Sequence, residues 1–197
     1  MRLLRIRLHK NILWLILDRP PLNNLTTEML EQLTGALRNA IKQPPALVVL
    51  TGAGERAFCA GVDLPNDSEA QRAKLLLAAR DTSTVFEELH NSTIPTVALV
   101  KGSAFGPGCE LAVLCDTIIA HEEAHFRLPA VNAKVFPDVV SVYLPASIGQ
   151  ETTTRLLQSG ETLTARQAMR VGLAHQVLPQ RRFLLDAEEL LVVLSTP

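Results

Sequence analysis

Two glycine-containing segments follow short apolar runs and could present backbone N–H groups to a ligand. The first reads ERAFCAGVDL at residues 55–64, and the second reads KGSAFGPGCEL at residues 101–111. Small residues let a ligand approach the main chain, and the start of a helix carries unsatisfied N–H groups with a partial positive charge. Such groups suit an anion or a developing oxyanion. Taken alone, the first segment is better explained as an ordinary tight turn.

Other chemistries that use glycine-rich loops or reactive cysteines lack their motifs here. The sequence contains neither the GxxxxGK[ST] pattern of a phosphate loop nor the GxSxG pattern of a nucleophile elbow. Its three cysteines, Cys59, Cys109 and Cys115, have no CxxC spacing, so we expect neither a disulfide framework nor a metal site. They are interpreted as small, reduced, buried residues, which favours a cytoplasmic protein.

The composition is that of an ordinary globular protein. Of the 197 residues, 47% are apolar, 4% are aromatic, and 19 basic residues face 20 acidic ones. This balance argues against a disordered chain and gives no attraction for nucleic acid or for an anionic membrane. The apolar run at 12–17 is too short to span a membrane and is followed by Asp18-Arg19-Pro20-Pro21, so we expect a strand pair there rather than a signal peptide.

The elements that must position the two segments alternate along the chain. Apolar periodicity and helix-terminating residues predict strands and helices in turn. The expected strands are 3–8, 12–17, 46–51, 96–100 and 117–120. The expected helices are 27–43, with Thr26 as N-cap, then 69–91, 109–114, 139–144, 151–160, 164–171 and 184–194. Short buried strands that alternate with helices predict an α/β domain with βαβ crossovers.

Several stretches together resemble the crotonase (enoyl-CoA hydratase/isomerase) superfamily over almost the whole chain. They are LDRPPLNNLT at 17–26, AFCAGVDL at 57–64, VKGSAFGPGCELAVLCD at 100–116, HFRLPAV at 125–131 and LTARQAMRVGLAHQVLP at 163–179. The resemblance implies a crotonase-like (ClpP/crotonase) spiral of repeated βαβ units, with a core domain at 1–183. Residues 184–197 would begin a shortened C-terminal helical region. The resemblance also implies a homo-oligomer, a trimer or a dimer of trimers.

The resemblance further implies an acyl-CoA thioester as substrate, with coenzyme A as part of that substrate and no separate cofactor. The Val62 N–H would grip the thioester oxygen. The second donor would come from Pro107, which has no N–H, so Gly108 is the candidate replacement. The positions that would hold coenzyme A are Leu22, Ala60, Val62, Asp63 and Leu64.

The proton-transfer groups that the resemblance implies are incomplete. Glu110 matches one of the two hydratase glutamates, whereas Ala130 stands at the other. Asp138 matches the place of a functional aspartate in the dienoyl-CoA isomerase and haloaroyl-CoA dehalogenase branches. Each carboxylate also has a structural alternative, Glu110 as a complement to a helix dipole and Asp138 as a helix N-cap.

We therefore expect an acyl-CoA-processing enzyme that stabilises a thioester enolate, with isomerase-type proton transfer favoured over hydration and with Glu110 and Asp138 as the acid/base pair. Pro107 and Ala130 keep two alternatives open. One is a catalytically weakened acyl-CoA-binding homologue, and the other is a CoA-thioester hydrolase or decarboxylase.

Overall fold

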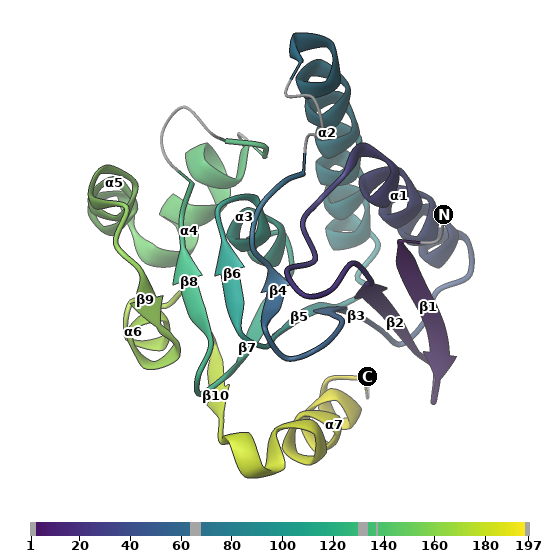
Figure 1. Cartoon of the computed structure of the whole chain (residues 1–197). Helices are drawn as coiled ribbons and strands as arrows, with labels where there is room; N and C mark the ends of the chain where they lie inside the picture. The colour runs from purple at the N-terminus through teal and green to yellow at the C-terminus, as the bar shows by residue number, and fades with distance from the viewer. Residues whose placement is uncertain (1–2, 64–67, 130–133, 137, 196–197) are drawn as a thin grey trace.

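A parallel β-sheet forms the centre of the fold, which is given by a computed structural model that describes residues 3–63, 68–129, 134–136 and 138–195 (Figure 1). Six strands pair in the order β1-β2-β3-β5-β7-β10. They are β1 (Leu4–His9), β2 (Ile12–Leu17), β3 (Leu47–Gly52), β5 (Thr96–Val100), β7 (Thr117–His121) and β10 (Gln176–Leu178). Only the β1–β2 pair is antiparallel. The expected strand pair at the N-terminus is therefore confirmed.

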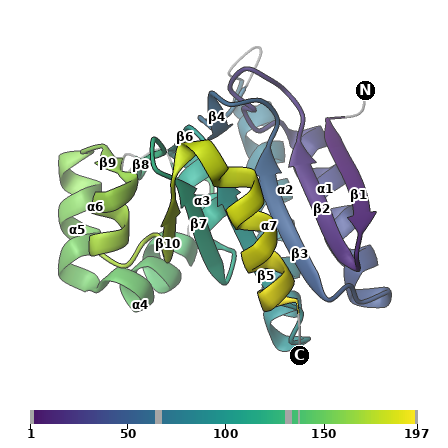
Figure 2. The same ribbon diagram turned by 90° about the horizontal axis from the view of Figure 1, so that it is seen from below.

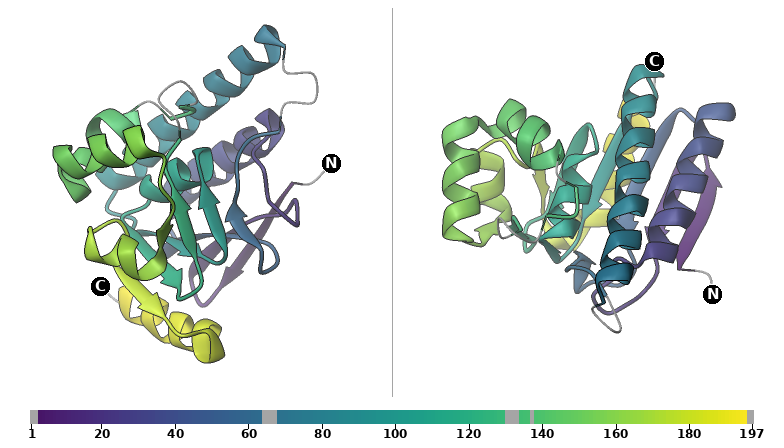
Figure 3. Two further views of the ribbon diagram at one scale, coloured as in Figure 1. Left: turned by 60° about the vertical axis from the view of Figure 1, so that its left-hand side comes forward. Right: turned by 90° about the horizontal axis from the view of Figure 1, so that it is seen from above.

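The two faces of this sheet are covered by different helices, as Figures 2 and 3 show. On one face α1 (Thr27–Lys42) packs beside α2 (Glu69–Asn91). On the other face lies α7 (Phe183–Leu194), which buries Phe183, Ala187 and Leu191 against the sheet. In β3 the side chains of Leu47 and Val49 join the α7 side, whereas Val48 and Leu50 join the opposite core. Both faces are apolar because both are covered.

The long helices begin and end close to where the sequence predicts. The Thr26 hydroxyl accepts a hydrogen bond from the Met29 N–H at 3.2 Å, which confirms Thr26 as the N-cap of α1. α2 occupies the predicted residues 69–91, and the backbone at Lys10 and Asn11 turns with positive φ between β1 and β2. Regular spacing of apolar residues thus sufficed to place these elements.

A second, smaller sheet stands beside the first and was not predicted. Its strands pair in the order β4-β6-β8-β9, and β4, β6 and β8 run parallel. The strands are β4 (Ala57–Cys59), β6 (Ser103–Phe105), β8 (His125–Arg127) and β9 (Leu163–Thr164). Each glycine-containing segment contributes one strand to this sheet. Because the two strands pair, the loops that follow them lie side by side.

Short helices complete the fold around the small sheet. They are α3 (Pro107–Val113), the π-helix η1 (Val139–Tyr143), α4 (Leu144–Ile148), α5 (Gln150–Ser159), α6 (Ala165–Arg170) and the 3-10 helix η2 (Gln180–Arg182). A helix was expected after Asp138, and one is present, but its first part is a π-helix. Asp138 stands at the N-cap position of η1, yet its side chain makes no capping hydrogen bond. Nowhere in the described ranges is a helix both long and apolar enough to cross a membrane.

Candidate active site

The loops after β4 and β6 are packed directly against each other. Gly108, in the first turn of α3, lies so close to β4 that a Cβ atom there would stand 2.0 Å from the Cys59 carbonyl oxygen. Gly106 precedes the helix with a φ of 52°, a left-handed conformation that favours glycine. Its N–H donates to the Arg127 carbonyl at 2.7 Å. Gly108 therefore lets the start of α3 lie directly against the end of β4, and Gly106 joins the same turn to β8.

The backbone around Val62 is held by neighbouring hydrogen bonds that leave its own N–H unused. The Ala60 N–H donates to the Leu22 carbonyl at 3.0 Å, and the Asp63 N–H donates to the Leu25 carbonyl at 2.8 Å. Leu25 in turn donates to the Gly61 carbonyl at 2.9 Å. Within the described part of the chain, the Val62 N–H has no recorded acceptor. It is thus a fixed donor of the kind that the resemblance implies for an oxyanion.

The position of the second expected oxyanion donor is held by a residue without an N–H. Pro107 is the first residue of α3, where proline suits the helix but supplies no N–H. The next N–H, that of Gly108, has no recorded acceptor among the described residues. Gly108 therefore stays the candidate replacement donor.

A cavity of about 510 Å³ opens where these loops meet α5. Its wall is formed by residues of both loops, of β8 and of the end of α5: Ala60, Gly61, Val62, Phe105, Gly106, Pro107, Arg127, Leu128, Pro129, Leu157, Gln158, Ser159 and Gly160. Among the described residues of this wall Arg127 is the only one with a charged side chain, and its guanidinium lies 4.7 Å from the centre of the Phe105 ring. Arg127 is not among the site residues expected from the sequence, because the strand β8 that places it was not predicted.

Glu110 is completely buried on α3, one turn beyond Pro107. Its Oε2 accepts hydrogen bonds from the Val135 N–H at 3.0 Å and from the Phe136 N–H at 3.3 Å. Oε1 is buried without a recorded hydrogen-bond partner. Burial raises the pKa of Glu110 to about 7, against the opposing effects of the two N–H donors and of Lys134. Glu110 is not on the wall of the 510 Å³ cavity, so its carboxyl group is closed off from solvent.

The second expected carboxylate, that of Asp138, does not share the buried environment of Glu110. Asp138 is exposed, and no hydrogen bond joins it to Glu110 among the residues that the structure describes. Asp138 directly precedes η1 and lies two residues after Phe136, the N–H of which donates to the Glu110 carboxylate. Ala130, which stands at the position of the missing glutamate, is outside the described residues.

The expected coenzyme A positions lie along one edge of the site. Leu22 is 44% exposed and is tied to Ala60 through the backbone. Asp63 forms an ion pair with Arg19. Arg19 is thus held at this edge, beside the residues that the resemblance assigns to coenzyme A. Leu64, the remaining expected position, is outside the described residues.

Two other groups have structural roles. His90, at the end of α2, contacts Asp116 (Nδ1 to Oδ1, 2.9 Å) and lies 3.1 Å from the Leu114 carbonyl. The Asp116 carboxylate raises the pKa of His90, so the pair ties the end of α2 to the end of α3. All three cysteines are buried, and burial raises the pKa of each thiol, that of Cys59 to about 12. They are therefore unreactive packing residues, as expected.

Several known proteins are similar to this chain in sequence. The sequence model of the enoyl-CoA hydratase/isomerase family matches residues 7–195. The 2,3-dehydroadipyl-CoA hydratase of Escherichia coli is 34% identical over 172 residues, which cover 86% of this chain and 67% of that protein. The carnitinyl-CoA dehydratase of Proteus mirabilis is 32% identical over 183 residues, which cover 91% of this chain and 69% of that protein.

Solved structures agree in fold. An enoyl-CoA hydratase/isomerase family protein from Silicibacter pomeroyi superimposes with a TM-score of 0.85 at 30% identity, covering 99% of this chain and 84% of that one. The enoyl-CoA hydratase of Bacillus anthracis gives a TM-score of 0.86 at 28% identity, covering 98% and 77%. The crotonase-like fold expected from the sequence is therefore confirmed, and the chain belongs to the enoyl-CoA hydratase/isomerase family.

Proposed function

We propose that the protein acts on an acyl-CoA thioester by stabilising its enolate at the Val62 N–H and moving a proton with Glu110. The observation that carries the proposal is the state of the Glu110 carboxyl group. One oxygen is fixed by two backbone N–H groups, the other has no recorded partner, and the pKa is raised to about 7. A carboxyl group in this state can both accept and return a proton near neutral pH.

The reaction that fits one such carboxyl group is a shift of the double bond in an enoyl-CoA. The proposal requires the acyl chain to reach from the 510 Å³ cavity to the buried Glu110 carboxyl group. Glu110 would then remove a proton from a carbon next to the double bond, and the electron pair would move toward the thioester carbonyl. The negative charge on that oxygen would be held by the Val62 N–H, with Gly108 as the candidate second donor. Return of the proton to another carbon completes an isomerisation with no other reactant. Asp138 stays the candidate partner if its segment turns inward with substrate.

Hydration or dehydration is the second candidate, because the relatives described above carry the names of a hydratase and a dehydratase. The partnerless Glu110 Oε1 could hold the water that this reaction needs. The absence of an N–H at Pro107 also keeps open a weakened acyl-CoA-binding homologue, and Asp138 keeps open a thioester hydrolase or decarboxylase.

The same proposal assigns coenzyme A to the edge formed by Leu22, Ala60, Val62 and Asp63, with no separate cofactor. The Ala60 and Asp63 N–H groups donate to the Leu22 and Leu25 carbonyls, and Val62 lies between these two anchored residues. The coenzyme A part of the substrate would therefore bind to a rigid stretch of the protein backbone. We further propose that the protein is a cytoplasmic homo-oligomer.

The deciding experiment follows a 3-enoyl-CoA and the matching 2-enoyl-CoA in D₂O by mass spectrometry. Isomerisation interconverts the two isomers, which chromatography separates before the mass measurement, and deuterium appears only where the Glu110 proton exchanges with solvent. Hydration instead adds the mass of D₂O. Glu110→Gln is expected to lower either rate by roughly 10²–10⁴-fold, which is the usual contribution of a general acid–base. Thioester binding by calorimetry with no turnover would support the weakened homologue. Full activity of Glu110→Gln would refute the proposed role of Glu110.

A further inference from the structure

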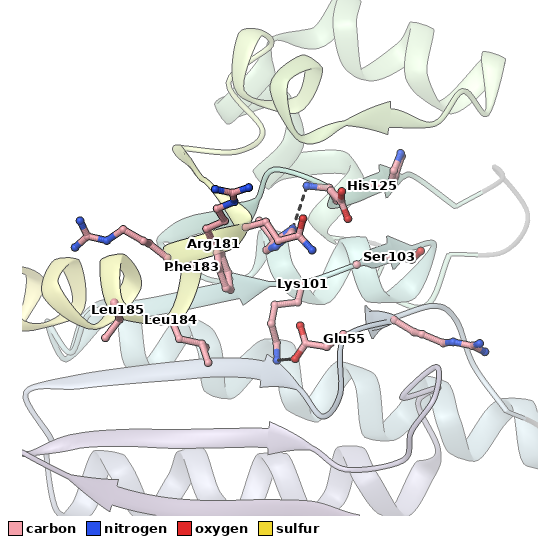
Figure 4. Close-up of a pocket in the computed structure, with 14 residues that line it drawn as sticks. Glu55, Lys101, Ser103, His125, Arg181, Phe183, Leu184 and Leu185 are labelled. Atoms are coloured by element: carbon pink, nitrogen blue, oxygen red, sulfur yellow. Dashed lines mark hydrogen bonds and ion pairs between the residues drawn. The ribbon is translucent and has the colours of Figure 1, made fainter.

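A second cavity, of about 450 Å³, lies at the opposite end of the small sheet (Figure 4). Because β4, β6 and β8 are parallel, the residues that precede them meet at one edge, whereas the loops of the candidate active site meet at the other. The second cavity is lined by residues before or at the start of these strands, and the start of α7 closes it. β6 illustrates the separation, since its Ser103 lines this cavity and its Phe105 lines the other.

His121 supplies this cavity with a fixed hydrogen-bond donor. The residue is only 9% exposed, and its ring packs edge-on against Phe183 with the ring centres 5.0 Å apart. Its Nδ1 accepts a hydrogen bond from the Glu123 N–H at 3.1 Å, so the neutral ring carries its proton on Nε2. That nitrogen has no recorded partner within the described part of the chain. Because His121 lines the cavity, this nitrogen is free to donate a hydrogen bond to a ligand there.

Lys101 adds a positive charge, which forms an ion pair with the exposed Glu55 side chain. Its side chain is 13% exposed, and its Nζ lies 3.1 Å from the Glu55 Oε1. The Glu55 side chain is 80% exposed, so its carboxylate can return to water at little cost. An anion that entered the cavity could therefore take the place of Glu55 on Lys101 without leaving a buried charge unpaired.

Apart from Glu123, whose carboxylate also lines the cavity, the remaining polar lining residues offer donors to an anion. The Ser103 hydroxyl and the guanidinium groups of Arg56 and Arg181 offer further donors, as Figure 4 shows for Ser103 and Arg181. Phe183 and Leu184 supply apolar surface on the α7 side. Ammonium, guanidinium, imidazole and hydroxyl donors together suit the several acceptor oxygens of a phosphoryl group. The volume is within the usual range for small-molecule sites.

We propose that this cavity is a binding site for a phosphoryl group, carried by a small molecule and held by His121 and Lys101. The ligand is either free phosphate or an organic phosphate whose apolar part rests on Phe183 and Leu184. In the unliganded protein Glu55 occupies the position of the anion on Lys101. The site is separate from the one proposed for the thioester, and its test uses no thioester.

The test measures binding of inorganic phosphate and of phenyl phosphate by calorimetry at low salt, together with the ring resonances of His121 by NMR. Glu55→Gln removes the internal competitor and is expected to tighten binding roughly two- to fivefold. Its matched control is Glu151→Gln, an equal change of net charge at the exposed start of α5, which should change nothing. Lys101→Gln should weaken binding about tenfold or more, whereas Lys42→Gln at the exposed end of α1 should not.

The two probes identify the source of the phosphoryl group. Tighter binding of phenyl phosphate supports an organic phosphate, and equal affinity supports free phosphate. The proposal is overturned if neither probe binds saturably, if the His121 resonances do not move, or if Glu55→Gln and Glu151→Gln have the same effect. Should Lys101→Gln fail to fold, the comparison of the two glutamate variants still decides, because both side chains are exposed.

Discussion

Pro107 is the residue at which this chain departs most clearly from the oxyanion donors that its family resemblance implies. Replacing it with glycine or alanine restores an N–H at the first residue of α3. One oxyanion donor is worth about 2.7–4 kcal/mol, so kcat/KM should rise by roughly 10²–10³-fold in Pro107→Gly. Steady-state kinetics on the better substrate of the enoyl-CoA pair measures this.

Pro107→Ala is the matched variant, because it restores the N–H without adding the flexibility of glycine. Both variants should gain activity if the donor is missing in the native protein. Unchanged activity in both would show that the Gly108 N–H, which has no recorded acceptor in the described structure, already serves as the second donor. A loss in Pro107→Gly alone would report helix weakening instead.

Glu110 should also make stability depend on pH. Burial raises its pKa in the folded state from 4.5 to about 7, so the folded protein binds this proton more tightly than the unfolded chain. The resulting stabilisation is complete below pH 4.5 and is lost as the pH rises through about 7. The shift corresponds to about 3 kcal/mol of unfolding free energy.

Denaturant unfolding of the native protein and of Glu110→Gln at acidic and alkaline pH checks this expectation. The variant cannot ionise, so its stability relative to the native protein should increase by about 3 kcal/mol between pH 4 and pH 8. A stability difference that stays constant across that range would mean that Glu110 is not held in a desolvated site.

At the scale of elements, the contact between β4 and α3 depends on Gly108. An alanine there would place its Cβ 2.0 Å from the Cys59 carbonyl oxygen, which is backbone and cannot swing away. Gly108→Ala should therefore destabilise the protein by about 1–3 kcal/mol or more and separate the two loops of the site. Thermal unfolding and kinetics on the same preparation measure both effects.

Gly35, in the middle of α1, provides the control. Outside the adjacent residues and backbone of its own helix, no described atom lies within 4 Å of a Cβ built there, so Gly35→Ala should stabilise the helix by about 0.5–1 kcal/mol. If the two substitutions had equal effects, the tight packing of α3 on β4 would not be what fixes the loops.

The elements differ in how far the sequence alone could predict them. α1, α2 and the strands of the large sheet carry long apolar patterns and caps such as Thr26, so their limits follow from residue spacing. β4, β6 and β8 have only three residues each, too few for a periodic pattern. Their pairing is decided by contacts between distant segments, such as Gly108 on Cys59, which no local signal contains.

In the candidate site too, some features followed from the sequence and others depended on contacts between distant segments. The resemblance of the two loop motifs to a known family was enough to single out Val62, Pro107 and Glu110 as candidates. The burial of Glu110 by Val135 and Phe136 could not be foreseen, since those residues are distant in sequence. The same holds for the exposure of Asp138 and for the place of Arg127 on the cavity wall.

At the scale of the whole molecule, α7 leaves apolar side chains uncovered. It buries Phe183, Ala187 and Leu191 against the large sheet, while Val193 is 69% exposed and its neighbours Val192 and Leu194 are 46% and 40% exposed. Adjacent exposed apolar residues at one end of a helix are typical of a contact surface. We expect a second copy of the chain to cover them, in keeping with the predicted homo-oligomer.

Light scattering coupled to size-exclusion chromatography tests this expectation. The native protein should have a mass above that of one chain, and Val193→Asp should shift it toward the monomer, because a carboxylate is costly to bury in an apolar contact. Leu77→Asp on α2 is the matched control, since Leu77 is 63% exposed on a different helix. A native protein that elutes as a monomer would refute the homo-oligomer. An equal response of the two variants would place the contact surface elsewhere than on α7.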